Sequence, residues 1–327
     1  MSEIERGRVL VTGASGFVGS HVAEELASVG WRVRCLVRAT SSRRWLTRAD
    51  YEFAIGDVSA LNGLAAALQG CDAVVHVAGI INALHPDEYF QVNAEGTLRL
   101  WMAAESCKVK RFVLISSLAA AGPGRGGPLQ DETRHPHPVG AYGKSKLAAE
   151  KAVLETGGPV EAVVVRPPFV YGPRDTEVLT LVRLAKRGWF PLAGARRLST
   201  IHVLDLAEGI RLALEKAEPG TTYYLTDGEA HALEELGSAM GHAQGVGVRF
   251  FAIPNWTLWL GAVAGELTES MIRRPAVLNL ERVRQFAQSD WTCSDARARR
   301  ELGFESRYDL IRGVEDTVRW YRSVGWI

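Results

Sequence analysis

A short glycine-rich segment near the start of the chain constrains its fold most strongly. The strand-like run Val9–Val11 leads directly into the segment Thr12–Gly19 (TGASGFVG), and a helical pattern follows at once. Gly13 permits a tight turn, Gly16 lets the backbone approach a pyrophosphate closely, and Gly19 lets the helix pack on the strand. Free N–H groups at the start of such a helix bind phosphate oxygens. Glycines also occur in ordinary turns, but this position and context favour a dinucleotide-binding turn.

Hydrophobic runs alternate with amphipathic stretches through the first half of the chain. The predicted strands are Val9–Val11, Arg32–Val37, Tyr51–Ile55, Ala73–Val77, Phe112–Ser116 and Ala162–Arg166. The predicted helices between them are Val18–Val29, Ala60–Leu68, Tyr89–Ser106 and Ala141–Glu155. Solid rather than alternating hydrophobicity is typical of strands that are covered on both faces. The pattern predicts an α/β fold with a Rossmann-type doubly wound parallel sheet.

The regular alternation fades after Pro167, which predicts a smaller C-terminal α/β lobe that binds substrate. We expect a dinucleotide-binding domain over residues 1–166 and mainly the substrate-binding lobe over 167–327, with segments around 200–225 returning to the first domain. The helices expected here are Thr176–Lys186, Val203–Lys216, Ala232–Gly241, Ala276–Phe286 and Leu310–Arg322, and the strands are Thr222–Thr226 and Arg249–Ile253.

Composition excludes several classes of partner. The formal net charge of the 327 residues is +1, which argues against nucleic-acid binding through bulk electrostatics. The four cysteines are scattered without a CxxC pair, so neither a metal site nor a disulfide framework is expected. No signal-peptide pattern is visible, which favours a cytoplasmic location. The most hydrophobic later segment is too short to span a bilayer, although an amphipathic helix over residues 254–264 that touches lipid is a weaker alternative.

The end of the second predicted strand bears on the choice of dinucleotide. An NAD-binding chain normally places Asp or Glu there for the ribose 2′-hydroxyl. This chain has Arg38 instead, followed by Ser42 and Arg43 among other hydroxyl and basic residues. Guanidinium groups pair well with phosphate, so NADP(H) is favoured over NAD(H); a solvated basic loop is the alternative. Asp57, next to Val58 after the third strand, is placed to meet the adenine.

Tyr142 and Lys146 lie one turn apart at the start of a predicted helix. A free phenol has a pKa of about 10, and a neighbouring ammonium lowers that value. Tyr142 is therefore the candidate for proton exchange with a carbonyl or hydroxyl group. Ser116 and Ser117 end a buried strand, where a hydroxyl can hold the reacting oxygen. Asn93 is a candidate for orienting Lys146, or else a packing residue.

Together these motifs resemble the extended short-chain dehydrogenase/reductase family, also called the NAD-dependent epimerase/dehydratase family. The matching segments are Thr12–Gly19, Gly56–Val58, His76–Gly79, Asn93, Ser116–Ser117, Tyr142–Lys146, Arg166–Pro173 and His202–Ala207. The resemblance implies a catalytic set of Ser117, Tyr142 and Lys146, with Asn93 in support, and a homodimer formed through the helix that carries the tyrosine. The residues expected to bind the cofactor are Gly13, Ser15, Gly16, Phe17, Val18, Gly19, Arg38, Ser42, Arg43, Asp57, Val58, Val77, Ala78, Gly79, Ser116, Tyr142, Lys146, Pro167, Phe169 and Val170.

Departures from the family pattern narrow the expected activity. Family dehydratases carry an Asp-Glu pair after the catalytic hydroxyl residue, whereas Leu118–Ala121 here has no carboxylate. The arginines that hold a sugar-nucleotide diphosphate are out of register at Arg196 and Arg197 and missing from residues 289–294. The chain is closest to the branch of 3β-hydroxysteroid dehydrogenases and dihydroflavonol reductases. We therefore expect interconversion of a ketone and a secondary alcohol on a small hydrophobic substrate. A nucleotide-sugar epimerase with tightly bound NAD and a non-catalytic dinucleotide-binding protein are the alternatives.

Overall fold

The structure is a computed structural model, and it describes residues 6–60, 63–194, 196–254, 256–260, 262, 283–284 and 288–327. A seven-stranded sheet forms its centre, in the order β11-β6-β5-β4-β1-β2-β3, with every neighbouring pair parallel. Its strands are β1 (Arg8–Thr12), β2 (Arg32–Val37), β3 (Glu52–Ile55), β4 (Ala73–His76), β5 (Arg111–Ile115), β6 (Glu161–Arg166) and β11 (Thr221–Tyr224). The predicted Rossmann-type parallel sheet is confirmed.

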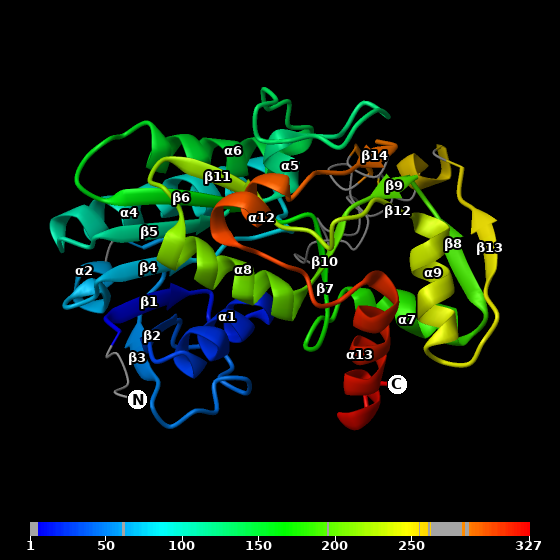
Figure 1. Cartoon of the computed structure of the whole chain (residues 1–327), viewed down its shortest axis with the longest axis horizontal. Helices are drawn as coiled ribbons and strands as arrows, with labels where there is room; N and C mark the ends of the chain where they lie inside the picture. Colours follow the sequence, from blue (N-terminus) through cyan, green and yellow to red (C-terminus); the bar gives the residue numbers. More distant parts are fainter. Residues whose placement is uncertain are drawn as a thin grey trace.

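Helices cover both faces of this sheet (Figure 1). One face packs against α1 (Phe17–Ser28), α8 (Val203–Lys216) and α12 (Ala296–Leu302). The other packs against α2 (Leu64–Leu68), α4 (Gly96–Ser106) and α6 (Gly140–Leu154). Side chains from alternate positions of each strand enter the two cores, because successive residues of a strand point to opposite faces. Within residues 200–225, α8 packs on the central sheet and β11 pairs with β6 at its edge.

The single helix predicted over Tyr89–Ser106 is interrupted in the structure. It comprises α3 (Pro86–Tyr89), the π-helical segment η1 (Phe90–Glu95) and α4. The short helix α5 (Leu118–Ala121), which follows β5 directly, was not predicted. Both irregularities lie beside the catalytic candidates, and π-helical turns are frequent at functional sites.

The C-terminal lobe lies beyond the carboxyl ends of the central strands, which is the usual ligand-binding side of an open α/β sheet (Figure 1). Its helices are α7 (Val178–Lys186), α9 (Leu233–His242) and α13 (Leu310–Ser323). Its strands form small sheets: β7 (Phe169–Tyr171) with β10 (Thr200–His202), β8 (Trp189–Leu192) with β13 (Arg249–Ala252), and β9 (Arg197–Leu198) between β12 (His231–Ala232) and β14 (Asp290–Trp291). The helix predicted over Ala276–Phe286 falls almost wholly outside the described residues. No helix among the described residues is long and apolar enough to cross a membrane.

An aromatic cluster joins the loop after β2 to the last helix. The ring of Trp45 lies 5.6 Å from that of Trp320 and 6.5 Å from that of Trp326, centroid to centroid. The guanidinium groups of Arg44 and Arg174 lie 4.6 and 5.2 Å from the Trp45 ring. These edge-on and cation–π contacts stabilise the loop against the lobe.

Candidate active site

The glycine turn has the geometry that a dinucleotide requires. Gly13 has a φ of +67°, and a Cβ at this position would lie 2.8 Å from the backbone nitrogen of Ala78. A Cβ on Gly19 would lie 2.2 Å from the carbonyl oxygen of Gly13. Helix α1 begins at Phe17 with no side-chain cap, so its first N–H groups are free to bind an anion. Ser15 and Val18, also expected at the cofactor, are half-buried in the same turn.

A buried hydrogen-bond chain connects this turn to the helix that carries Asn93. The Thr12 hydroxyl is 2.6 Å from His76 Nδ1, and His76 Nε2 is 3.0 Å from the Thr97 hydroxyl. Thr12 Oγ1 also accepts from the N–H of Ala78, and Thr97 donates to the carbonyl of Asn93. Burial lowers the pKa of His76 to about 3, so the imidazole is neutral and can bridge the two hydroxyl groups. Thr97 was not among the residues predicted at the site.

The residues of the loop after β2 that were expected to bind the cofactor have different surroundings. Arg38 is exposed, and its charge acts on Asp57. Burial raises the pKa of Asp57, but hydrogen bonds from Ser59 and the Arg38 charge outweigh it, and the net pKa is lowered. Arg43 instead stacks on the ring of Phe53, 4.5 Å from its centroid, which directs its guanidinium towards β3. The hydroxyl of Ser42 accepts a hydrogen bond from the backbone of Arg44.

Helix α6 brings Tyr142 to Ser117. The Ser117 hydroxyl lies beside the Tyr142 phenol, and the Tyr142 ring packs edge-on against Tyr89 at 6.0 Å, centroid to centroid. Ser117 is the N-cap of α5, where its hydroxyl accepts from the N–H of Ala119. Burial raises the pKa of Tyr142, and the Ser117 hydroxyl opposes that shift. The expected lowering of this pKa by Lys146 is therefore not what governs the phenol in this structure.

The ammonium group of Lys146 is buried under the sheet edge. It donates a hydrogen bond of 2.6 Å to the carbonyl of Ile115, the last residue of β5. Burial lowers its pKa to about 8, and the Glu150 carboxylate acts in the opposite direction. A Cβ on Gly79 would lie 3.0 Å from Asn93 Oδ1 and 3.7 Å from Lys146 Nζ, so the glycine lets the chain after β4 pass close to both side chains.

Asn93 supports this arrangement through the backbone rather than through Lys146 directly. Its side chain bonds both the N–H and the carbonyl of Ile80, at 2.8 and 3.0 Å. Its amide also donates to the hydroxyl of Ser145, the residue before Lys146. Asn93 therefore fixes the chain that leaves β4 relative to α6. Because π-helical η1 carries Asn93, the widened turn is part of this positioning.

The two adjacent serines point to different partners. Ser116 donates to Glu150 within a buried network, whereas Ser117 meets Tyr142. Arg166 closes the network with two bonds to the Glu150 carboxylate, at 2.8 and 2.6 Å, and a third to the Tyr224 hydroxyl. The Ser116 hydroxyl, which we expected at the cofactor, is thus engaged by Glu150. Glu150 itself was missed, although its spacing four residues after Lys146 places both on one helix face.

The remaining expected residues surround the same sheet edge. The carbonyl of Pro167 accepts from Leu118 at the start of α5. Phe169 and Val170 are half-buried in β7, and Val77 is half-buried beside the Gly13 turn. Val58 is buried against the first turn of α4. Across the site, Asn82 donates to Glu177 at the beginning of α7.

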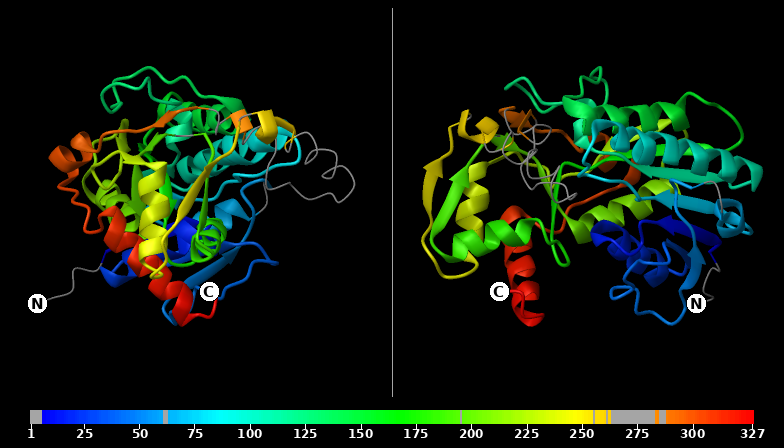
Figure 2. Two further views of the ribbon diagram at one scale, coloured as in Figure 1. Left: turned by 90° about the vertical axis from the view of Figure 1, so that its right-hand side faces the viewer. Right: turned by 180° about the vertical axis from the view of Figure 1, so that it is seen from behind.

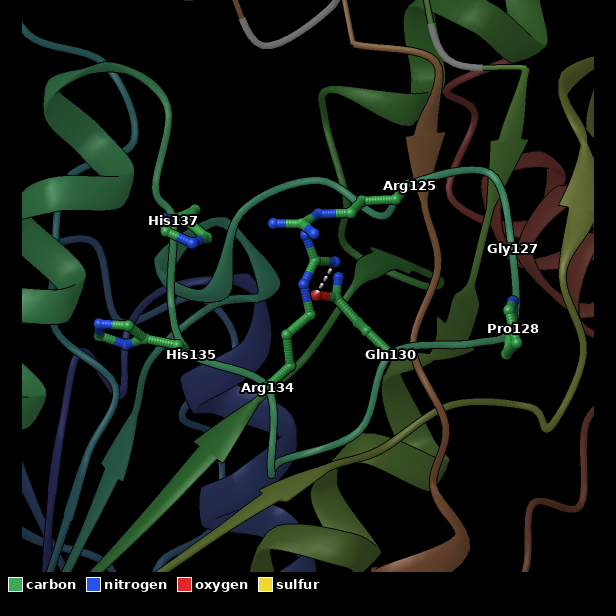
Figure 3. A pocket seen from close by; sticks show the side chains of 7 residues that line it. All are labelled: Arg125, Gly127, Pro128, Gln130, Arg134, His135 and His137. Carbon is green, nitrogen blue, oxygen red and sulfur yellow. Dashed lines mark hydrogen bonds between the residues drawn. The ribbon is translucent and has the colours of Figure 1, made fainter.

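A basic pocket of about 350 Å³ lies in the loop between α5 and α6 (Figure 3). Arg134 donates to Gln130 there, and the rings of His135 and His137 lie 5.5 Å apart. Its lining residues are Arg125, Gly127, Pro128, Gln130, Arg134, His135 and His137. This lining contains no carboxylate and none of the catalytic candidates, so the pocket is separate from Tyr142 and presents positive charge to solvent. Among the described residues no cluster could hold a metal ion.

Comparison with known proteins agrees with this geometry. The sequence profile of the NAD dependent epimerase/dehydratase family matches residues 9–225. The chain belongs to this family. Its sequence is 32% identical to that of a ceramide reductase of Caulobacter vibrioides, over 100% of this chain and 98% of the relative. It is also 30% identical to a 3-beta-hydroxysteroid dehydrogenase of Mycolicibacterium neoaurum, over 97% of this chain and 92% of the relative.

Among solved structures, this family member is similar to the UDP-glucose 4-epimerase of Thermus thermophilus in complex with NAD. The identity is 25%, the TM-score is 0.78, and 96% of this chain and 99% of the other are covered. The family therefore includes reductases, dehydrogenases and epimerases that share one fold, and the family is NAD-dependent. The expected resemblance is confirmed.

Proposed function

We propose that the protein is an NADP(H)-dependent reductase or dehydrogenase that interconverts a ketone and a secondary alcohol on a hydrophobic, lipid-like substrate. The observation that carries this proposal is the placement of the Ser117 hydroxyl beside the Tyr142 phenol, with Lys146 one helical turn further along α6. A phenol next to a hydroxyl that can hold the substrate oxygen is equipped to exchange a proton with that oxygen.

Each residue of this set has a distinct task. When bound, the dinucleotide supplies or accepts the hydride, and Gly13, Gly16 and the free start of α1 hold its pyrophosphate. Tyr142 gives its proton to the ketone oxygen, which Ser117 holds by a hydrogen bond. Because burial raises the pKa of Tyr142, the phenol keeps its proton until that transfer. The positive charge of Lys146 stabilises the phenolate that remains.

The preference for NADP(H) rests on the end of β2. No carboxylate follows Val37, and the exposed Arg38 is available to pair with a 2′-phosphate. NAD(H) is the alternative, since the family is NAD-dependent. Arg43, stacked on Phe53, contributes less to this preference than the sequence suggested.

The proposed substrate class follows from what the site lacks and from its relatives. Leu118–Ala121 forms a buried apolar helix with no carboxylate for an elimination step. Arg197 is engaged by the carbonyl of Gly127 and lies 3.9 Å from Asp290, so it is not a free clamp for a diphosphate. The names of the relatives, a ceramide reductase and a steroid dehydrogenase, support a hydrophobic substrate. Similarity to a UDP-glucose 4-epimerase keeps sugar-nucleotide epimerisation as the second candidate.

We also propose that the protein acts as a cytoplasmic homodimer through α4 and α6. Leu98 and Met102 of α4 are 37% and 57% exposed, which leaves apolar surface beside the helix that carries Tyr142. Light scattering after size-exclusion chromatography measures this directly, and Met102→Glu shifts a dimer to monomer if α4 forms the interface.

The test of the proposed activity is the loss of NADPH absorbance with a panel of steroid, long-chain and aromatic ketones and β-keto acids, with NADH run in parallel. We expect turnover of a hydrophobic ketone with NADPH, and a rate about a thousandfold lower with Tyr142→Phe. Interconversion of UDP-sugars by protein that retains NAD, with no net cofactor consumption, would favour the epimerase. Cofactor binding with unchanged turnover in Tyr142→Phe would favour a non-catalytic role for this residue.

A further inference from the structure

The two-stranded sheet at the outer end of the lobe has an unusual outward face. β8 and β13 lie at the edge of the molecule farthest from the central sheet in both Figure 1 and Figure 2. Phe190 is buried, and Phe250, although 37% exposed, turns to the same side of the sheet, because a Cβ on Gly237 of α9 would lie within 2.8 Å of both rings. Side chains alternate along a strand, so Trp189 and Phe251 face outward, 49% and 42% exposed, with ring centroids 6.3 Å apart.

A helical turn extends this apolar face. Residues 256–260 are helical, with Trp256 64% and Leu260 62% exposed. Leu258, on the other side of the turn, is buried against Ala193 and Ile253, which follow β8 and β13. The turn is therefore anchored beside the strand pair and holds its tryptophan towards solvent.

The charged residues in the two segments that form this face all have one sign. Between residues 183 and 192 and between 246 and 260, every charged residue is Lys or Arg and none is Asp or Glu. Lys186, Arg187 and Arg249 are exposed, and the Arg249 guanidinium lies 5.9 Å from the centre of the Trp189 ring. An ordinary outward sheet face carries polar side chains, whereas this one combines exposed aromatic rings with a basic border.

We propose that this docking face, made of the outer side of β8 and β13 and residues 256–260, binds the surface of a lipid bilayer that contains anionic head groups. Tryptophan and arginine side chains are stable at the level of the lipid head groups, where the ring is buried and the cation stays hydrated. Basic residues add attraction to anionic lipid. The docking itself does not depend on the proposed activity. Its use, bringing a lipid-like ketone to Tyr142, rests on the proposed function.

The test is sedimentation of the full chain with phosphatidylcholine vesicles, with and without phosphatidylglycerol. We expect binding to the anionic vesicles, weakened by salt, and a loss of at least about tenfold in affinity for Trp189→Ser/Phe251→Ser, because burial of two rings is lost. Lys186→Gln/Arg249→Gln removes the preference for phosphatidylglycerol. Ile55→Ser and Ile311→Ser, which alter equally exposed apolar residues elsewhere, leave binding unchanged.

Two results would overturn the proposal. One is a wild-type chain that stays in the supernatant with both vesicles. The other is equal binding by wild type and Trp189→Ser/Phe251→Ser, with both folded by circular dichroism. If that double variant instead breaks a self-association of the free protein while vesicles never bind, the face contacts a second copy. Turnover of a water-soluble ketone separates the claims, because its absence alongside intact vesicle binding contradicts only the proposed function.

Discussion

Helix α6 and the outer strand pair β8–β13 depart from the usual distribution of side chains in opposite directions. Helix α6 buries a lysine and a glutamate, Lys146 and Glu150, whereas the strand pair exposes Trp189 and Phe251. Charged side chains are rarely buried without partners, and clustered apolar ones are rarely left in water. Under the two proposals above, the difference reflects what each region binds: α6 holds charges for proton transfer, and the strand pair presents rings to a lipid surface.

The largest expected effect comes from the buried site. Tyr142→Phe removes the proton donor but keeps the ring against Tyr89, so ketone reduction falls by about a thousandfold while the free energy of unfolding changes little. Steady-state kinetics and urea denaturation measure the two quantities on the same sample. An equal fall in stability would mean that the phenol is structural and that the comparison fails at its first region.

Breaking the buried ion pair tests whether the charges of α6 are truly sequestered. Arg166 and Glu150 have 6% and 2% of their side chains exposed. Glu150→Gln leaves the guanidinium without its charge partner and lowers the free energy of unfolding by about 3 kcal/mol. The matched control is Glu161→Gln, which removes the partner of Arg111 at a site where the glutamate is 50% exposed and costs about 0–1 kcal/mol. Similar losses of unfolding free energy in both variants would contradict the distinction between a buried and an exposed ion pair.

The pH dependence of reduction gives a smaller and more specific test. Since burial lowers the pKa of Lys146 to about 8, its ammonium is present below that pH and is lost above it. We expect ketone reduction to decline as the pH rises through about 8, and this inflection to be absent from the residual rate of Lys146→Met. Cofactor affinity measured across the same range shows whether the decline reflects binding or chemistry. A rate that rises through this range would be incompatible with the role given to Lys146.

Arg38→Ser probes an exposed charge. If its guanidinium meets a 2′-phosphate, the ratio of the NADPH to the NADH Michaelis constant rises by about tenfold. Arg43→Ser is the control, because that guanidinium is stacked on Phe53. Equal effects of the two substitutions would mean that the ratio of Michaelis constants responds to the general surface charge and not to a contact between Arg38 and the 2′-phosphate.

The smallest effect is expected at the outer face. Trp189→Ser changes the free energy of unfolding by about 0.5 kcal/mol or less, because half of the side chain is already in water. Phe190→Ser, its buried neighbour, costs several-fold more. If the two substitutions destabilise equally, Trp189 belongs to the core and the contrast between the two regions disappears.

The sequence predicted best what is decided locally. The central strands begin and end within a residue or two of their predicted bounds, because most of them are apolar runs that lie between turn residues. The conformation of the Gly13 turn is likewise determined by residues that are adjacent in the sequence. The short strands β9, β12 and β14 were not predicted, since each exists only through pairing with a distant segment. The π-helical η1 was missed because its hydrophobic pattern matches an ordinary helix.

The site was predicted in part for the same reason. The spacing of Tyr142 and Lys146 is a local feature, and the structure brings Ser117 to Tyr142. That Ser116 turns to Glu150 depends on Arg166, which lies on another strand. The raised pKa of Tyr142 depends on burial by the assembled fold, so residue spacing could not reveal it.

The aromatic cluster around Trp45 has a consequence for biosynthesis. The loop that bears Arg38 is among the first segments to leave the ribosome, but its packing partners Trp320 and Trp326 emerge after every other element described above. During translation, the strands of the Rossmann sheet are therefore synthesised before this loop can pack against Trp320 and Trp326. If Arg38 selects the coenzyme as proposed, this selectivity requires α13, because the loop that bears Arg38 packs on Trp320 only after that helix has been synthesised.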